Sequence, residues 1–275
     1  MKKIFYILIS ITICLSCEDV VDVDVLFSDP RLVVDASFEL YTNETPVNLE
    51  GGVRLTLSAP YFDTNVPTVS NANVFITNKN DDSIINFVES GEDGFYIPET
   101  LGFLPEFNTP YELTVNYLGE TYVATTQLIP TVPIDNVVQG DATLFDDDET
   151  EIIISFTDDG SRDDFYLFDF DFSLFLASED RFYQGQPFKF SYFYENMVAG
   201  QDVTIKILGV DQRYYNYATL LIEQSEQDGG NPFLAPPSVL RGNIINTTNQ
   251  DNFAYGYFNL SEADRIDFTI EDKNL

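Results

Sequence analysis

The sequence predicts an all-β protein with two immunoglobulin- or fibronectin-like β-sandwich domains and one short helix in the second. Apolar and polar residues alternate along most of the chain after residue 31, which is typical of strands with one buried face. Turn-forming residues separate these segments at short intervals, as in sandwich folds. Two prolines within residues 128–133 interrupt the pattern and indicate a stiff linker between two domains.

The first sixteen residues are typical of a secretion signal. Lys2 and Lys3 precede an apolar run over residues 4–15. As a helix this run is about 18 Å long, too short for the hydrocarbon core of about 30 Å, and its charge pattern fits a signal peptide. Ser16 directly precedes Cys17, as in the lipobox of bacterial lipoproteins. We therefore expect removal of residues 1–16 and lipid attachment at Cys17, with ordinary signal cleavage near Ser16 as the alternative.

An acidic tether is expected over residues 17–29. Glu18 and Asp19 follow Cys17 directly, and acidic residues at this place resemble the export signal of lipoproteins on the outer face of the Bacteroidota outer membrane. The alternative is a solvated acidic spacer with no signal function. Loss of residues 1–16 leaves no transmembrane helix in the expected mature chain. The expected location is the outer membrane, lipid-anchored and exposed at the cell surface.

The first sandwich is predicted over residues 30–129. Its strands are expected over residues 32–40, 53–58, 73–77, 83–88, 94–97, 111–117 and 121–128. Tyr111, followed by Glu112 and Leu113, resembles the tyrosine corner of immunoglobulin-like folds, in which the hydroxyl hydrogen-bonds to a nearby backbone group.

The second β domain is predicted over residues 130–275. Strands are expected over residues 151–156, 166–176, 188–194, 203–207, 254–259 and 265–270. The alternating aromatic residues in these strands indicate a buried core rather than a platform for sugar stacking. A helix is expected near residues 211–227, because apolar residues recur there at helical spacing and Asp211 can serve as its N-cap.

Several segments resemble one family when they are read in order. They are Cys17 to Asp19, residues 31–36, 57–63, 71–74, 94–96 and 111–115, then Gly119, Tyr122, Ala124, Thr126, Leu128, Pro130, Ile134 and Asp135, and more loosely residues 158–166 and 242–244. This combination resembles the Bacteroidota outer-membrane lipoproteins grouped as domain of unknown function 4249. The resemblance implies an outer-membrane lipoprotein, commonly encoded beside TonB-dependent transporters, and it implies no catalytic residues.

Composition excludes several classes of function. The 275 residues contain no histidine, which removes Ser-His-Asp chemistry and imidazole ligation of metals. A net charge of −33 argues against a nucleic-acid partner, because phosphate binding needs clustered basic residues. The sequence therefore predicts a protein that is not an enzyme. A glycosidase-like carboxylate pair is the alternative, but most acidic residues fall at outward strand positions or in loops, where ordinary titration is expected.

Two loop regions are candidate ligand or partner sites. Oxygen-rich loops offer weak calcium candidates, and no other cofactor is expected: Asp146, Asp148, Asp158, Asp159, Asp163 and Asp164. Solvated acidic turns are the simpler interpretation of these loops. A second loop is apolar and proline-rich, and it either packs on its own domain or binds a partner: Asn231, Pro232, Phe233, Leu234, Pro236 and Pro237.

The predicted function is that of a non-catalytic outer-membrane lipoprotein. It is expected to act as an accessory or substrate-capture partner of a TonB-dependent transporter. The alternative is a free-standing adhesion module, or a module that binds a glycan, a peptide or calcium.

Overall fold

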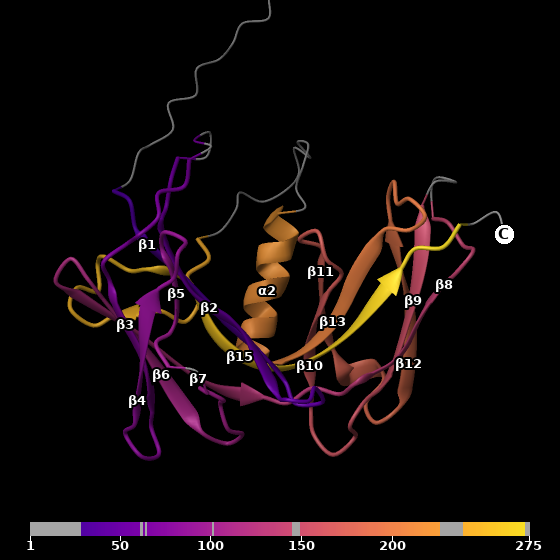
Figure 1. Ribbon diagram of the computed structural model, residues 1–275, viewed down its shortest axis with the longest axis horizontal. Coiled ribbons are helices and arrows are strands. Elements are labelled where there is room, and N and C mark those ends of the chain that lie inside the picture. The colour runs from indigo at the N-terminus through magenta and orange to yellow at the C-terminus, as the bar shows by residue number, and fades with distance from the viewer. Residues whose placement is uncertain are drawn as a thin grey trace, which may run out of the picture.

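The computed structural model describes residues 29–60, 63, 65–100, 102–144, 149–225 and 239–272. Within these residues the protein is built from β-strands and one α-helix, as Figure 1 shows. The predicted all-β class with a single helix is confirmed. Within the same residues, no helix is long and apolar enough to cross a membrane.

Eight strands of the described chain close into a barrel. They are β1 (Leu32–Tyr41), β2 (Asn48–Leu57), β3 (Asn73–Asn78), β4 (Ile84–Glu89), β5 (Phe95–Pro98), β6 (Pro110–Tyr117), β7 (Glu120–Ile129) and β15 (Tyr255–Thr269). Neighbouring strands follow the order β15-β1-β2-β5-β4-β3-β6-β7, and β7 pairs back onto β15. A short strand, β14 (Ile245–Asn246), adds to β7.

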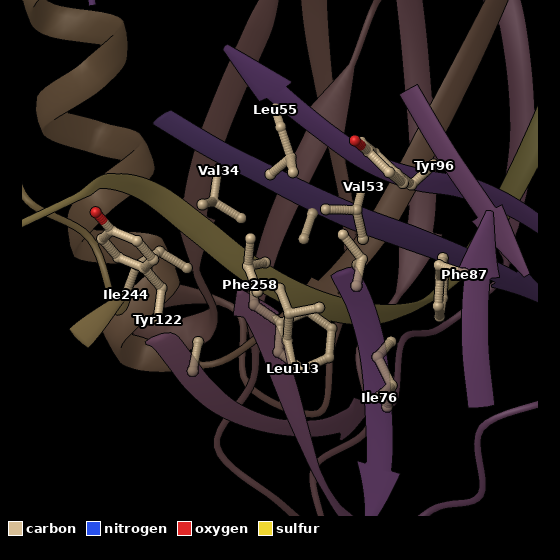
Figure 2. Packing of buried hydrophobic residues seen from close by; sticks show 14 of the residues in the cluster. Val34, Val53, Leu55, Ile76, Phe87, Tyr96, Leu113, Tyr122, Ile244 and Phe258 are labelled. Atoms are coloured by element: carbon tan, nitrogen blue, oxygen red, sulfur yellow. The ribbon is translucent and has the colours of Figure 1, made fainter. Parts of the chain in front are cut away.

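Apolar side chains fill the barrel interior. Alternate residues of β1, from Leu32 to Leu40, point inward and are buried, because successive strand residues face opposite sides of a sheet. Figure 2 shows Val34, Leu113 and Phe258 converging from three different strands. The interior is therefore a packed core rather than an open channel, as in other small barrels.

The second part of the molecule consists of two facing sheets. In the first, β13 (Asp202–Val210), β10 (Phe165–Asp169) and β11 (Phe175–Glu179) extend outward from β15. The second contains β8 (Ile134–Gln139), β9 (Thr150–Thr157) and β12 (Pro187–Tyr194), and a 3-10 turn, η1 (Asp180–Phe182), precedes β12. Phe156, Tyr166, Phe168 and Phe170 are buried between the two sheets, so this part of the aromatic stripes is core, as expected. Phe172 instead is 52% exposed, and Phe188, Phe190 and Tyr192 are only partly buried against the same core.

Strand β15 joins the two parts. Its first half pairs in parallel with β1, from Val33–Tyr255 to Leu40–Glu262. Its second half pairs antiparallel with β13, from Ala263 to Thr269. The chain after the linker thus returns to the barrel through β14 and β15, although β7 ends at Ile129, where the sequence placed a domain boundary.

The prediction of two immunoglobulin-like sandwiches is wrong. The first seven predicted strands need β15, about 220 residues after β1 in sequence, to close a barrel. Period-two alternation predicts which face of a strand is buried, but it does not identify the neighbouring strand. Tyr111 does make the expected local contact, because its hydroxyl accepts a hydrogen bond from the Glu106 amide at 3.0 Å. That motif occurs here in a barrel.

Two predicted strand boundaries also differ. The strand expected over residues 166–176 is broken into β10 and β11, because Asp171, Phe172 and Ser173 have φ values of 67°, 51° and 63°. These values lie in the left-handed region, which a strand cannot accommodate. In contrast, the segments predicted over residues 254–259 and 265–270 belong to one continuous strand, β15.

The predicted helix and its cap are confirmed. Helix α2 spans Gln212–Ser225, and the Asp211 carboxylate accepts a hydrogen bond from the Tyr214 amide at 2.6 Å, which is N-cap geometry. One side of the helix packs on β11 and β10, and Ala218 lies in a buried cluster with Leu167 and Leu208. Figure 1 places α2 in the concave region between the barrel and the two facing sheets.

Candidate functional site

A pocket of about 450 Å³ lies where the barrel meets the second part of the molecule. Its walls come from the outward faces of β1 and β15, from β10, β11 and β13, and from α2. Because the even-numbered residues of β1 fill the barrel, Val33, Asp35, Ser37 and Glu39 point outward and line this space. We call it the junction pocket. Its volume falls in the range typical of small-molecule sites.

Asp35 is the unpartnered acid of the junction pocket. Its side chain is open to solvent, yet protein surrounds it closely enough that desolvation raises the pKa of its carboxyl, an effect that the nearby Arg54 guanidinium only partly offsets. Both observations fit a group in a concave pocket with an open mouth. Among the described residues, no side chain forms a hydrogen bond or ion pair with Asp35. This carboxylate has therefore lost part of its hydration without a compensating contact.

Two other acids in the pocket share a lysine. Lys206 Nζ lies 3.0 Å from Glu39 Oε2 and 3.6 Å from Asp169 Oδ2. Burial alone would lower the Lys206 pKa, but the Glu39 carboxylate and its hydrogen bond raise it above the usual value. Desolvation raises the pKa of Asp169, and Lys206 opposes this shift. Lys206 thus links a barrel strand to β10, whereas Asp35 forms no ion pair among the described residues and has only the nearby Arg54 charge.

Three tyrosine rings form an aromatic cluster beside Asp35. Tyr214 and Tyr217 lie three residues apart on α2, so they share one face of the helix, and Tyr257 comes from β15. The ring centroid of Tyr257 lies 4.9 Å from that of Tyr214 and 5.0 Å from that of Tyr217. Burial raises the pKa of all three hydroxyls, and the Asp35 charge adds to the shift at Tyr214 and Tyr217. All three therefore remain neutral at physiological pH.

Two of the calcium candidates are brought together through one buried tyrosine. The Tyr166 hydroxyl lies 2.6 Å from Asp158 Oδ1 and 3.0 Å from Asp164 Oδ2. The second Asp158 oxygen accepts a hydrogen bond from the Gly185 amide at 2.7 Å. The two Asp164 carboxylate oxygens accept hydrogen bonds from Arg162 Nε at 2.7 and 2.9 Å. These contacts satisfy the carboxylates from within the protein.

The remaining calcium candidates do not join them. Asp159 accepts hydrogen bonds from Ser161 and forms an ion pair with Arg162 at 3.2 Å. Asp163 accepts a hydrogen bond from Gln184 Nε2 at 3.0 Å. In the part of the chain that the structure describes, no three acidic or cysteine side chains are grouped as metal ligands. Asp146 and Asp148 lie outside that part. Calcium binding stays a prediction.

Other predicted site residues also lie outside the described ranges. They are Cys17, Glu18 and Asp19, and the loop residues Asn231, Pro232, Phe233, Leu234, Pro236 and Pro237.

Comparison with known proteins places the sequence in a family. Residues 18–267 match the family described as Domain of unknown function (DUF4249). The chain belongs to this family. The family predicted from the sequence motifs is thereby confirmed. No curated protein matches the chain. The family match runs from the residue after Cys17 into β15 and so includes every residue that lines the junction pocket.

Sequence reasoning missed the junction pocket within this family region. Asp35 appeared only as a polar position in an alternating strand, and Tyr214 as an apolar position of the helix. One signal was present in the sequence: Tyr214 and Tyr217 put two large rings on one face of a helix. Asp35 and Tyr257 are 222 residues apart, so only the parallel pairing of β1 with β15 reveals that they are close.

Proposed function

We propose that the protein is a lipid-anchored, non-catalytic component of the outer membrane that captures a small substrate for a TonB-dependent transporter. The observation that carries this proposal is the junction pocket, an open, partly aromatic cavity of about 450 Å³ where two parts of one chain meet. Ligand sites form preferentially at such junctions. The anchor part of the proposal rests on the sequence around Cys17.

The chemistry of the pocket favours binding over catalysis. Glu39 and Asp169 are held against Lys206, so their charges serve an ion-pair network. A general acid and base would need two carboxyl groups placed on either side of a reacting bond. Asp35 faces tyrosine hydroxyls that stay neutral at physiological pH. Such walls can hold and orient a ligand.

Membrane attachment is tested by replacing Cys17. The Cys17→Ala variant of the full precursor is expected to lose acylation and to appear in the soluble fraction, because Cys17 is the expected attachment point of the lipid that anchors the protein. Labelling with an alkyne fatty acid and fractionation of the cell envelope measure both effects. Equal labelling of the variant and the parent would contradict lipid attachment at Cys17.

Partnership is tested by affinity capture of the tagged lipoprotein from native membranes in mild detergent. A TonB-dependent transporter is expected in stoichiometric amount, and the Cys17→Ala variant is the matched control for membrane co-localisation. Absence of any transporter, with the lipoprotein intact, would contradict the capture role. That result would favour the free-standing binding or adhesion module.

A further inference from the structure

The junction pocket has an unusual charge pattern. Asp35, Glu39 and Asp169 line it, and no arginine or lysine does so within the described residues. Lys206 approaches two of these acids from outside the lining, and Asp35 remains without an ion pair. The net charge of the protein is −33, so the surrounding field also attracts cations and repels anions.

The aromatic cluster adds a second preference for positive charge. The faces of tyrosine rings carry negative electrostatic potential, and they attract ammonium and guanidinium groups within about 6 Å of the ring centroid. Tyr214, Tyr217 and Tyr257 place three such rings at the same pocket as Asp35. A carboxylate beside a group of aromatic rings is the arrangement that binds organic ammonium ions.

The rest of the lining excludes a bare metal ion. Calcium needs about six to eight oxygen ligands, whereas Leu167, Leu208, Phe175 and Leu221 add hydrocarbon surface to the lining. Phe175 and Leu221 are 39% and 48% exposed, so they offer apolar contact to an entering ligand. The lining fits a ligand with one charged end and one apolar end.

We propose that the junction pocket binds a small organic cation, with its ammonium group between Asp35 and the tyrosine cluster and its apolar part against Phe175 and Leu221. This inference rests on the proposed role of the pocket as the capture site. It adds the chemical class of the substrate.

The test uses the detergent-solubilised full lipoprotein and three probes of similar size. Benzyltrimethylammonium carries a positive charge, benzyl alcohol is neutral and phenylacetate is negative. Isothermal titration at fixed ionic strength is expected to give saturable binding of the cation. The other two probes should bind at least about tenfold more weakly, a difference that one charge-assisted contact can supply. Equal or tighter binding of either, or no binding of the cation, would overturn the proposal.

Two variants locate the binding. Asp35→Asn keeps the shape of the side chain and removes its charge, and it should weaken cation binding about tenfold. Tyr217→Leu should weaken it severalfold through the lost cation–π contact. Asp93→Asn removes the same charge at an exposed position outside the pocket and should leave the affinity unchanged. Circular dichroism confirms that each variant folds. Equal losses in Asp35→Asn and Asp93→Asn would overturn the proposed contact.

The cation-binding test can fail or succeed independently of the test for the transporter-capture role. If a transporter is recovered from membranes but benzyltrimethylammonium does not bind, the cation inference is wrong and the capture role stands. If the cation binds through Asp35 but no transporter is recovered, the ligand class stands and the capture role is wrong.

Discussion

Individual polar residues in this protein differ in how well their charges are compensated. The Asp158 and Asp164 carboxylates are buried, and hydrogen bonds from Tyr166, Gly185 and Arg162 hold them. Asp35 is more open to solvent but has no such contact among the described residues. A buried acid with partners supports the fold, whereas an unpartnered acid in a pocket lowers stability and is available to a ligand.

Replacing Asp35 should stabilise the ligand-free protein. Because the folded-state pKa of Asp35 is raised, ionisation of this group disfavours the folded state at pH 7. This cost disappears as the pH falls below its unfolded-state value, where both states are protonated. The Asp35→Asn variant should therefore melt at a higher temperature at pH 7. The gain should stay below about 1 kcal/mol because solvent reaches the group.

Thermal melts of Asp35→Asn and the parent at pH 7 and pH 3.5 measure this difference. The gap in melting temperature should narrow at the lower pH. A lower melting temperature for the variant at pH 7 would show that Asp35 supports the fold.

Removing the Tyr166 hydroxyl should have the opposite effect. Tyr166→Phe deletes the hydrogen bonds to Asp158 and Asp164 and leaves buried carboxylate oxygens without them. The expected loss is about 1.5–3 kcal/mol of unfolding free energy, as for hydrogen bonds to charged groups. Urea denaturation measures it. Tyr255→Phe is the control, since no hydrogen bond of its hydroxyl occurs among the described residues. Equal stability of both variants would contradict the assigned role of Tyr166.

At the scale of single elements, β15 has the position with the strictest steric and pairing requirements. It pairs with β1, β7 and β13 and runs as one strand through both parts of the molecule. Gly256 near its start has φ +102°, and a Cβ there would lie 2.0 Å from the Val34 carbonyl oxygen. Glycine is required at this place because the β1 backbone approaches so closely.

The Gly256→Ala variant should lose more than about 2 kcal/mol of unfolding free energy, since strained φ and a backbone clash act together. Gly119 gives a matched control. It has φ +81°, but nothing lies within 4 Å of the position of its Cβ, so Gly119→Ala should lose only about 1–2 kcal/mol. Denaturant titration compares the two. A smaller loss at Gly256 than at Gly119 would contradict the close approach of β1 and β15.

For the whole molecule, the shared strand predicts cooperative unfolding. The core of the barrel and the core between the two facing sheets are separate clusters. Unfolding of either part, however, removes a strand with which β15 pairs. Differential scanning calorimetry should therefore give one transition, with its calorimetric and van't Hoff enthalpies in agreement. Two resolved transitions would indicate that the barrel and the facing sheets unfold independently.

Local features of this fold could be predicted from the sequence, and long-range ones could not. The strand over residues 32–40 follows from its alternation, the α2 start follows from Asp211, and the Tyr111 contact follows from its motif. Each depends on neighbours in sequence. The barrel depends on the parallel pairing of Val33 with Tyr255, and no local pattern encodes that pairing.

The candidate site was harder to predict for the same reason. Asp35, Tyr214 and Tyr257 meet only after β1 pairs with β15 and α2 docks beside them. The acidic loop over residues 158–164 was visible in the sequence as oxygen-rich, but its carboxylates are occupied by Tyr166, Arg162 and backbone amides. Composition reveals how many ligand atoms a loop contains, and not how many are already bonded.

The pairing of β1 with β15 also sets an order of events during folding. Residues 32–129 supply seven strands of the barrel, but the wall between β1 and β7 stays open until residues 255–262 arrive. Contacts this distant in sequence form slowly, because a long loop must close before they contribute. A growing chain therefore remains incompletely folded until β15 is released. That delay suits the secretion signal expected over residues 1–16, because an exported chain crosses a membrane before it folds.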